Sequence, residues 1–244
     1  MRPEVHAEMA AVQQRHWWFV ARRRVLARVI DALALPPQAQ LLDAGCGSGG
    51  NLAMLASRGC LQAMEIDDGA RQAAAALGIC PVHAGALPDA WPFADARFDL
   101  VCLLDVLEHI DDDVAALRRI GQQLRPGGRV LVTVPAYAWM WSAHDEAHEH
   151  RRRYSATALR QVAHAAGLDV QRLGYFNSLL FPLIALARLV GRGRAQAPQS
   201  DAALPAPAVN AALQSLFALE RHVVPHALFP FGTSVLAVLK ASAR

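Results

Sequence analysis

The sequence predicts an α/β fold in which the strands of one sheet run parallel and helices cover both of its faces. Short apolar runs that fit buried strands alternate with longer helical stretches, which is typical of parallel βαβ units. A glycine-rich turn joins the first apolar run to the helix after it. Hydrophobic residues make up 54% of the 244 residues and charged residues 18%, so the chain can bury a core and general disorder is excluded.

The expected elements follow in order from the periodicity. Residues 5–33 form one helical segment that ends before Pro36 and Pro37. Ser155 caps a later helix and Gly167 ends it. We expect strands over residues 41–43, 60–66, 98–104, 129–134, 168–175 and 233–239, and helices from the glycine turn to residue 58 and over 69–77, 112–124, 156–166, 178–190 and 208–222. The stretch 191–207, rich in Gly, Arg, Pro and Ala, is the expected disordered segment.

Charge and cysteine usage bound the compartment and the partners. A net charge of +3 is too small to argue for nucleic acid, and every basic residue except Lys240 is arginine, which fits a GC-rich bacterial genome. The four cysteines form no CxxC pair, which argues against a zinc or disulfide framework and for a reducing cytoplasm. Residues 1–12 lack the apolar core of a secretory signal. The apolar runs 179–187 and 223–239 fall short of the roughly 20 uninterrupted residues that a membrane span needs.

The strongest local signal is the glycine turn at residues 41–50, which reads Leu-Leu-Asp-Ala-Gly-Cys-Gly-Ser-Gly-Gly. Glycines there let a strand turn sharply into a helix and bring main-chain N–H groups against a ligand. Glu65 ends the next strand 22 positions after Asp43, where an acidic side chain would hold a ribose diol. The carboxylate of Asp43 would repel a pyrophosphate but suits a ligand with an ammonium group. The pattern therefore points away from NAD.

Five segments in this order resemble the motifs of class I S-adenosylmethionine-dependent methyltransferases, nearest to the small-molecule and quinone branch (methyltransferase type 11-like). They are the glycine turn, the strand end at Glu65, Phe-Asp-Leu-Val at 98–101, Asp-Val-Leu-Glu-His at 105–109 and Leu-Arg-Pro-Gly-Gly at 124–128. The resemblance implies a Rossmann-like sheet of seven strands, the last of which, residues 233–239, is antiparallel. It also implies S-adenosylmethionine as cofactor and S-adenosylhomocysteine as product.

The resemblance further implies roles for individual residues at the cofactor. Glycines of the turn would approach its methionine part, and Glu65 would hold both ribose hydroxyls. Asp105 and His109 would lie beside the sulfonium. Gly85 and the alanine before it would lie near the adenine, although His83 stands where many family members have an aspartate. The residues expected at the cofactor are Trp18, Arg22, Asp43, Gly45, Cys46, Gly47, Gly49, Glu65, Ile66, Gly85, Asp105 and His109.

Three interpretations stay open for the N-terminal segment, where His-Trp-Trp-Phe at 16–19 precedes Arg-Arg-Arg at 22–24. The aromatic side chains could pack on the core with the arginines solvated. The helix could instead be a lid, with Arg22 pairing the cofactor carboxylate through a forked hydrogen bond. It could also lie at a membrane interface, with the arginines on anionic lipid.

The loop 144–154 is the most polar stretch of the chain and follows the fourth strand, at the sheet edge where open α/β folds bind ligands. Many related bacterial methyltransferases show a similar His-Asp…His-x-Arg-Arg-Tyr run. Because a neutral imidazole can remove a proton from an acceptor hydroxyl, we expect His144, His150 and Tyr154 to be catalytic. A network that only orders the loop is equally open. Three histidines could also hold a metal ion, but we expect no metal site.

The insertion at residues 178–231 separates the last two strands, where the family usually has a short hairpin. Its first helix is apolar nearly all round and is followed by Arg188, Arg192 and Arg194. Such a helix must be buried, pair with another chain or touch lipid. Either a cap over the site or a membrane contact would give the acceptor pocket an apolar wall.

We therefore expect four parts: an N-terminal helical lid at 1–37, an α/β core at 38–177, the helical insertion at 178–231 and the last strand at 232–244. The expected activity is methyl transfer from S-adenosylmethionine to a small hydrophobic or lipid-linked acceptor, at oxygen. C-methylation of an activated aromatic or quinol ring and an inactive cofactor-binding protein are the alternatives. We expect a cytoplasmic monomer or homodimer, with peripheral contact to the inner membrane through 178–194 left open.

Overall fold

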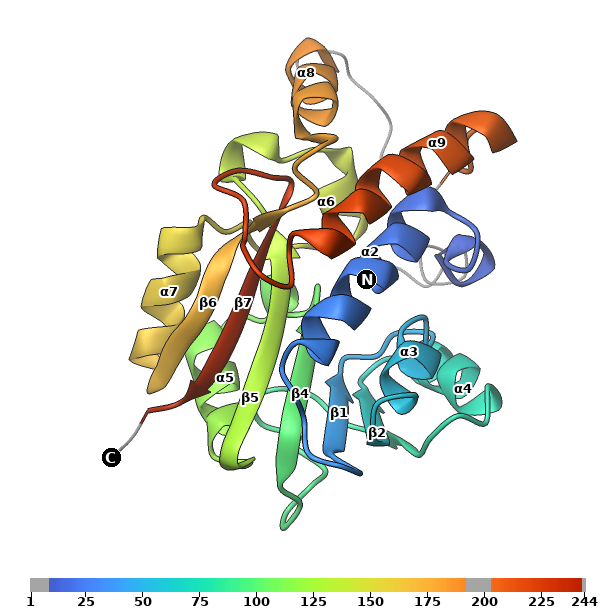
Figure 1. The fold of residues 1–244 in the computed structure, drawn as a ribbon. Helices are drawn as coiled ribbons and strands as arrows, with labels where there is room; N and C mark the ends of the chain where they lie inside the picture. The colour runs from blue at the N-terminus through green and yellow to red at the C-terminus, as the bar shows by residue number, and fades with distance from the viewer. Residues whose placement is uncertain (1–8, 192–202, 243–244) are drawn as a thin grey trace.

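The computed structural model describes residues 9–191 and 203–242, which form one α/β unit built on a seven-stranded sheet (Figure 1). The strand order is β3-β2-β1-β4-β5-β7-β6, and β7 runs antiparallel to both of its neighbours. The strands are β1 (Gln40–Ala44), β2 (Cys60–Glu65), β3 (Val82–Ala84), β4 (Phe98–Leu104), β5 (Leu124–Pro135), β6 (Leu168–Phe176) and β7 (Ser234–Ala241). The predicted fold class, with its antiparallel last strand, is confirmed.

Helices cover both faces of the sheet, and an apolar cluster lies between the sheet and the helices on each face. Two helices pack on one face: α5 (Asp113–Gly121) and α7 (Ala156–Ala165). The other face is covered by α2 (Trp17–Asp31), α3 (Leu52–Ala56), α4 (Asp68–Ala76) and α9 (Pro207–Ala218). The remaining elements are η1 (Leu107–His109), η2 (Ala138–Met140), α6 (Ala143–Ala147), α8 (Phe181–Gly191) and η3 (Leu219–His222). The Ser155 cap is confirmed, since its side chain accepts from the amide of Ala158, and Gly167 follows the helix with φ +78°.

The N-terminal segment is not the single helix that its periodicity predicts. Residues 9–12 are helical, 13–16 form a turn, and α2 then begins at Trp17. His16 separates the two because its Nδ1 accepts the amide of Trp18 at 3.3 Å, as an N-cap does. Residues 1–8 lie outside the described part of the chain, as does most of the stretch expected to be disordered (192–202).

Strand β3 and the start of β5 were not predicted. Val82–Ala84 is three residues long and half-exposed, so no apolar alternation marks it. Strand β5 begins at Leu124 rather than at 129 because the chain stays paired with Phe98 before a register shift admits the Pro-Gly-Gly turn. All four cysteines are free in this structure.

The insertion between β6 and β7 places α9 beside α2 and lets α8 project from one end of the molecule (Figure 1). Ile184 of α8 packs toward the core, while Leu183, Leu186 and Leu189 are 60%, 59% and 50% exposed. Among the described residues, no helix combines the length and the hydrophobicity that crossing a bilayer requires. The exposed leucines leave one side of α8 uncovered by the described part of the chain.

Candidate active site

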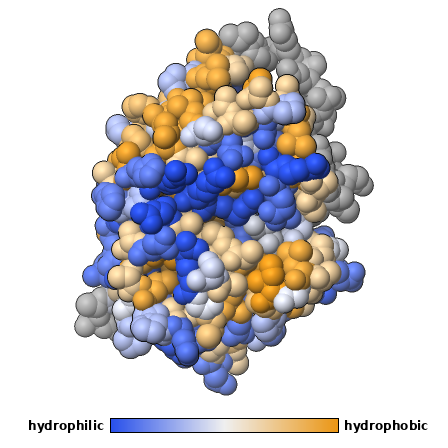
Figure 2. Space-filling model, turned by 45° about the vertical axis from the view of Figure 1, so that its right-hand side comes forward, coloured by the Kyte–Doolittle hydropathy of each residue, from blue (hydrophilic) through white to orange (hydrophobic). Residues whose placement is uncertain are grey.

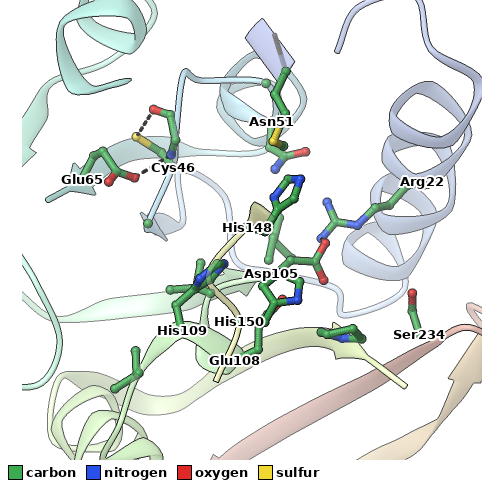
Figure 3. Close-up of a pocket in the computed structure, with 18 of the residues that line it drawn as sticks. Arg22, Cys46, Asn51, Glu65, Asp105, Glu108, His109, His148, His150 and Ser234 are labelled. Atoms are coloured by element: carbon green, nitrogen blue, oxygen red, sulfur yellow. Dashed lines mark hydrogen bonds and ion pairs between the residues drawn. The ribbon is translucent and has the colours of Figure 1, made fainter. Parts of the chain in front are cut away.

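A cavity of about 1220 Å³ opens at the carboxyl ends of β1, β2 and β4 (Figure 3). The glycine turn and Glu65 form one wall, and the histidine-rich loop after β5 forms another. Residues of α2 and α8 also contribute to its lining. Ligand pockets commonly measure about 300–1000 Å³, so this cavity can hold a nucleoside cofactor and a second molecule together. Of the predicted site residues, those that line it are Trp18, Arg22, Gly45, Cys46, Gly47, Glu65, Ile66, Gly85, Asp105, His109, His144 and His150.

Glu65 fixes the glycine turn from the end of the neighbouring strand. One of its carboxylate oxygens accepts the amide of Gly47 at 2.8 Å, and the other accepts the amides of Ile66 and Asp67 at 2.9 Å each. The side chain is buried and faces the cavity. A carboxylate offers about four lone-pair sites, so one remains for a ligand hydroxyl.

Gly45 is required at its position for two reasons. Its φ is +86°, and a Cβ there would lie 2.7 Å from a methyl group of Val106. Gly47 also has a positive φ, +55°, but a Cβ on it would meet open space rather than protein. The turn therefore packs on one side and leaves its other side to the cavity. Cys46 beside it is not reactive, because burial raises the pKa of its thiol.

Arg22 joins α2 to the carboxyl ends of β4 and β5. Its guanidinium lies 2.7 Å from Asp105 and donates to the hydroxyl of Thr133 at 2.7 Å, and that hydroxyl donates to Asp105 at 3.1 Å. The ring of Trp18 stacks under it, with its centroid 5.1 Å from the guanidinium carbon. Arg22 is buried, so of the three open interpretations the one with solvated arginines does not describe this residue. The helix packs on the core and lines the cavity at the same time.

Three predicted site residues lie outside the cavity wall: Asp43, Gly49 and Tyr154. Asp43 is buried, neither of its carboxylate oxygens has a hydrogen-bond partner in the described part of the chain, and burial raises its pKa to about 7. Gly49 has φ +87° and packs against Leu77. The Tyr154 hydroxyl is buried and donates to Asp113 at 2.7 Å, so in this structure its side chain holds the loop and does not line the cavity. Near the predicted adenine site, the ring of His83 packs edge-on against Phe93.

Four histidines gather on the opposite wall of the cavity (Figure 3). The ring centroids of His109 and His150 are 4.8 Å apart, those of His144 and His148 are 4.1 Å apart, and the two pairs adjoin through the 5.7 Å separation of His148 and His150. Burial, with the neighbouring His150, lowers the pKa of His109 to about 3. Burial, with the neighbouring His148, also lowers the pKa of His144 well below its ordinary value. Both rings are therefore neutral at pH 7.

Asp145 organises this wall. Its carboxylate is fully buried, lies 2.9 Å from Nδ1 of His150 and accepts two hydrogen bonds from Arg153, at 2.7 and 3.0 Å. It also accepts the amide of Ser142 at 2.9 Å. Burial alone would raise its pKa, but the hydrogen bonds from His150 and Arg153 outweigh it and hold the pKa well below its usual range. A carboxylate on Nδ1 fixes the imidazole and leaves Nε2 for chemistry.

Glu108 is the site residue that the sequence did not single out. It precedes His109 in the Asp-Val-Leu-Glu-His motif and lines the cavity. Its side chain is fully buried, and neither carboxylate oxygen has a hydrogen-bond partner among the described residues. Burial, reinforced by the nearby Asp105, raises its pKa well above the ordinary value. Adjacency to His109 in the motif was the only available signal.

The strand order with a reversed β7 and a glycine turn held by an acidic residue define a class I methyltransferase-like domain. Residues 18–173 match the family described as "Methyltransferase domain", and the chain belongs to this family. S-adenosylmethionine is its cofactor. The remaining lone-pair site on Glu65 fits a ribose hydroxyl, and the open space beside Gly47 fits the methionine part of the cofactor against the main chain.

Curated relatives match over part of their length. The ubiquinone biosynthesis O-methyltransferase of Aeromonas salmonicida is 29% identical over 54% of this chain and 63% of that protein. The O-methyltransferase resE of Aspergillus sclerotiorum is 31% identical over 46% of each. This chain thus spans less than two thirds of the length of these relatives.

Solved structures share the fold. A TehB-like SAM-dependent methyltransferase from Corynebacterium glutamicum has a TM-score of 0.55 and 19% identity, with 88% of this chain and 86% of that chain covered. The plantazolicin methyltransferase BamL, in complex with S-adenosylhomocysteine, has a TM-score of 0.60 and 15% identity, with 90% and 84% covered. At these identities the likeness bears on the fold alone.

Proposed function

We propose that this chain transfers a methyl group from S-adenosylmethionine to a hydroxyl oxygen of a hydrophobic small molecule or a lipid-linked acceptor. The observation that carries the proposal is the single cavity that joins the Glu65 wall to the histidine wall. The cofactor supplies a methyl group on a sulfonium sulfur, so the protein mainly aligns the two reactants. Alignment of this kind can contribute about 7–11 kcal/mol to lowering the barrier.

His150 is the proposed base, with His144 as the second candidate. The Asp145 carboxylate holds Nδ1 of His150 at 2.9 Å, so Nε2 can accept a proton from an acceptor hydroxyl in the cavity. A base is needed at oxygen but not for an activated aromatic carbon. Two of the relatives named above, from Aspergillus sclerotiorum and Aeromonas salmonicida, are O-methyltransferases, which supports the same choice.

A hydrophobic acceptor is favoured by the walls that the insertion and α2 add. Trp17, Phe19 and Ile184 line the cavity beside the histidines. On α8, Ile184 and Arg188 are four residues apart and both line the cavity, so the helix turns one face to the site. A hydrophobic acceptor with a polar reacting group matches a cavity that has both apolar walls and a histidine wall.

Tritium transfer from methyl-labelled cofactor tests the proposal directly. We would offer a phenolic polyprenyl lipid and the matching hydroquinone, extract the product and assign the new methyl group by NMR. Methyl on oxygen, lost by at least about 100-fold in His150→Ala and retained in the exposed His164→Ala control, is the expected result. Methyl on a ring carbon would support the C-methylation alternative, and binding of S-adenosylhomocysteine without transfer to any acceptor would support the inactive one.

We also propose that α8 rests on an anionic membrane from the cytoplasmic side. Leu183, Leu186 and Leu189 are exposed along the helix, and the rings of Trp139 and Phe231 adjoin its first residue, Phe181. Figure 2 shows hydrophobic side chains gathered at the upper end, where α8 projects, above a band of hydrophilic ones. The expected contact 178–194 extends into residues 192–194, outside the described part.

Co-sedimentation with vesicles of phosphatidylcholine and phosphatidylglycerol tests the membrane contact. The double variant Leu183→Asp/Leu186→Asp should lose most of the bound fraction, because two charges would enter the bilayer interface. Leu77→Asp is the matched control, since Leu77 is 49% exposed at the end of α4, away from α8. Equal binding of all three proteins would remove the membrane from the proposal.

A further inference from the structure

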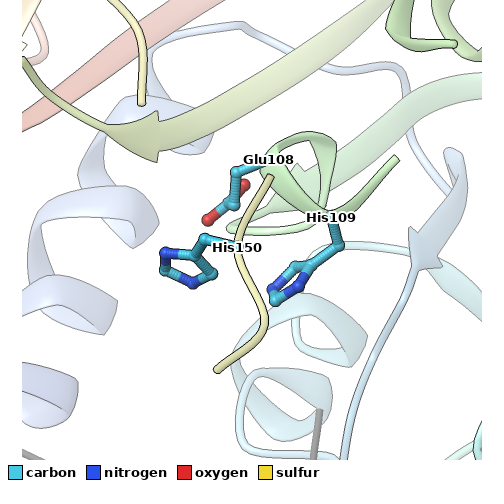
Figure 4. Close-up of side chains that lie close together, drawn as sticks. All are labelled: Glu108, His109 and His150. Atoms are coloured by element: carbon cyan, nitrogen blue, oxygen red, sulfur yellow. The ribbon is translucent and has the colours of Figure 1, made fainter. Parts of the chain in front are cut away.

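We propose that Glu108, His109 and His150 bind a divalent transition-metal ion, zinc being the first candidate, with open coordination positions toward the cavity. The three residues come from two segments, η1 after β4 and the loop after α6. Their metal-binding atoms all lie within 4.8 Å of one another (Figure 4). This departs from the expectation, based on the sequence, that the site holds no metal.

The carboxylate of Glu108 is the first reason. It is fully buried, it lines the cavity, and neither of its oxygens has a hydrogen-bond partner among the described residues. An isolated buried carboxylate is costly, and an unsatisfied buried group of this kind calls for a missing partner such as an ion. The guanidinium groups of Arg22 and Arg153 lie close enough to act on this carboxylate electrostatically, but neither donates a hydrogen bond to it. Arg151 contacts Glu108 from its main-chain amide to the Glu108 carbonyl.

The support of the two histidines is the second reason. Asp145 lies 2.9 Å from Nδ1 of His150 and is itself held by Arg153. His109 hydrogen-bonds the backbone at Glu149. Histidines that bind metals usually have their other ring nitrogen fixed by a carboxylate or a backbone carbonyl in this way. The support fixes the orientation that a ligand would need.

The donor set indicates which metal would bind. Two imidazoles and one carboxylate suit zinc or iron(II) rather than calcium or magnesium, which prefer oxygen ligands. Ligands at about 2.0–2.2 Å from a tetrahedral zinc ion lie roughly 3.3–3.6 Å apart, so atoms now within 4.8 Å of one another need to approach by at most about 1.5 Å. Three protein ligands leave room for a further ligand, and the side left open is the cavity.

The chemical class of that further ligand is an oxygen donor. If the proposed function holds, the ion would orient an acceptor hydroxyl or enol and favour its deprotonated form, as zinc does for bound water. Nε2 of His150 would then be a ligand, and His144 would be left as the base. The metal site itself does not depend on this step.

Metal binding by tag-free protein tests the inference. After treatment with a chelator, zinc would be titrated against a chromophoric competitor, and the bound metal counted by mass spectrometry. Wild type should bind zinc at about one ion per chain. Glu108→Gln and His150→Ala should each weaken binding by at least about 100-fold, because loss of a supporting residue alone costs about 10–100-fold. Asp145→Asn should fall within that smaller range.

The control variant is His164→Ala, an exposed histidine on α7 that should leave zinc affinity unchanged. Calorimetric titration of the metal-free proteins with S-adenosylhomocysteine separates the two proposals. Zinc binding without S-adenosylhomocysteine binding would overturn the proposed function and leave the metal site standing. Equal zinc affinity in wild type, Glu108→Gln and His150→Ala would overturn the metal site, whatever the cofactor does.

Discussion

The Glu65→Gln substitution tests whether Glu65 forms the cofactor wall. One oxygen of Glu65 accepts the Gly47 amide at 2.8 Å and the other accepts two further amides. A glutamine keeps one acceptor oxygen and places an NH2 donor against a backbone donor, whichever way it is flipped. The loss is therefore at least one charge-assisted hydrogen bond, about 1.5–3 kcal/mol, together with the negative charge that would accept a ribose hydroxyl. Affinity for S-adenosylhomocysteine should fall by about 10- to 150-fold in calorimetric titrations.

A matched control separates cofactor binding from stability. Glu220 is also a buried carboxylate that accepts three backbone amides, those of Asn177, Ser178 and Leu179 at 2.6–2.9 Å, but it does not line the cavity. Glu220→Gln should lower the thermal midpoint about as much as Glu65→Gln while leaving S-adenosylhomocysteine affinity within about twofold of wild type. Unchanged affinity in Glu65→Gln, or an equal loss in both variants, would refute the role given to Glu65.

Three further changes probe residues around the cavity. Burial raises the pKa of Asp43 to about 7, so the folded state holds a proton that the unfolded chain releases, and the free energy of unfolding falls as pH rises from about 4 to about 7. Asp43→Asn should remove this fall, which denaturant titrations should measure as up to about 4 kcal/mol. Tyr154→Phe should lower the free energy of unfolding by about 1–3 kcal/mol through the loss of its bond to Asp113, with S-adenosylhomocysteine affinity unchanged; a stable but inactive variant would restore its catalytic role. Arg22→Met should lower the free energy of unfolding in the same titrations by about 3 kcal/mol, at the low end for a buried ion pair because Asp105 is 27% exposed. Adding Asp105→Asn to this variant should recover part of the loss, because the unpaired charge is then removed.

Local sequence rules account for the sheet and for the glycine wall. Apolar runs gave β4 with its bounds, and the spacing between the glycine turn and the end of β2 placed Glu65 where it meets Gly47. Both results depend on residues that are near in sequence or on strands that pair in parallel. Strand β3 was not predicted because its three half-exposed residues show no hydrophobic periodicity. Its place in the sheet is fixed by pairing with β2.

Long-range burial could not be predicted in the same way. Polar residues such as Asp43 and Tyr154 look like ligand contacts in a motif, and only the packed fold shows that one points into the core and the other bonds to Asp113. Glu108 is the opposite example. From the sequence, a glutamate beside a histidine is expected to be solvated, but the structure buries it fully. The hydrophobic pattern predicts which strands are buried, but not which polar side chains are buried with them.

The histidine loop was open to two interpretations, a network that orders the loop and a site that acts on the acceptor. The contacts of Asp145 make these one arrangement. One of its oxygens accepts the amide of Ser142 at the start of α6, and the other accepts from Arg153 at the end of the loop and lies 2.9 Å from Nδ1 of His150. His150 also lines the cavity, and without this anchor its ring would be free to rotate. The order of the loop is thus what makes His150 available, either as a base or as a ligand to a metal.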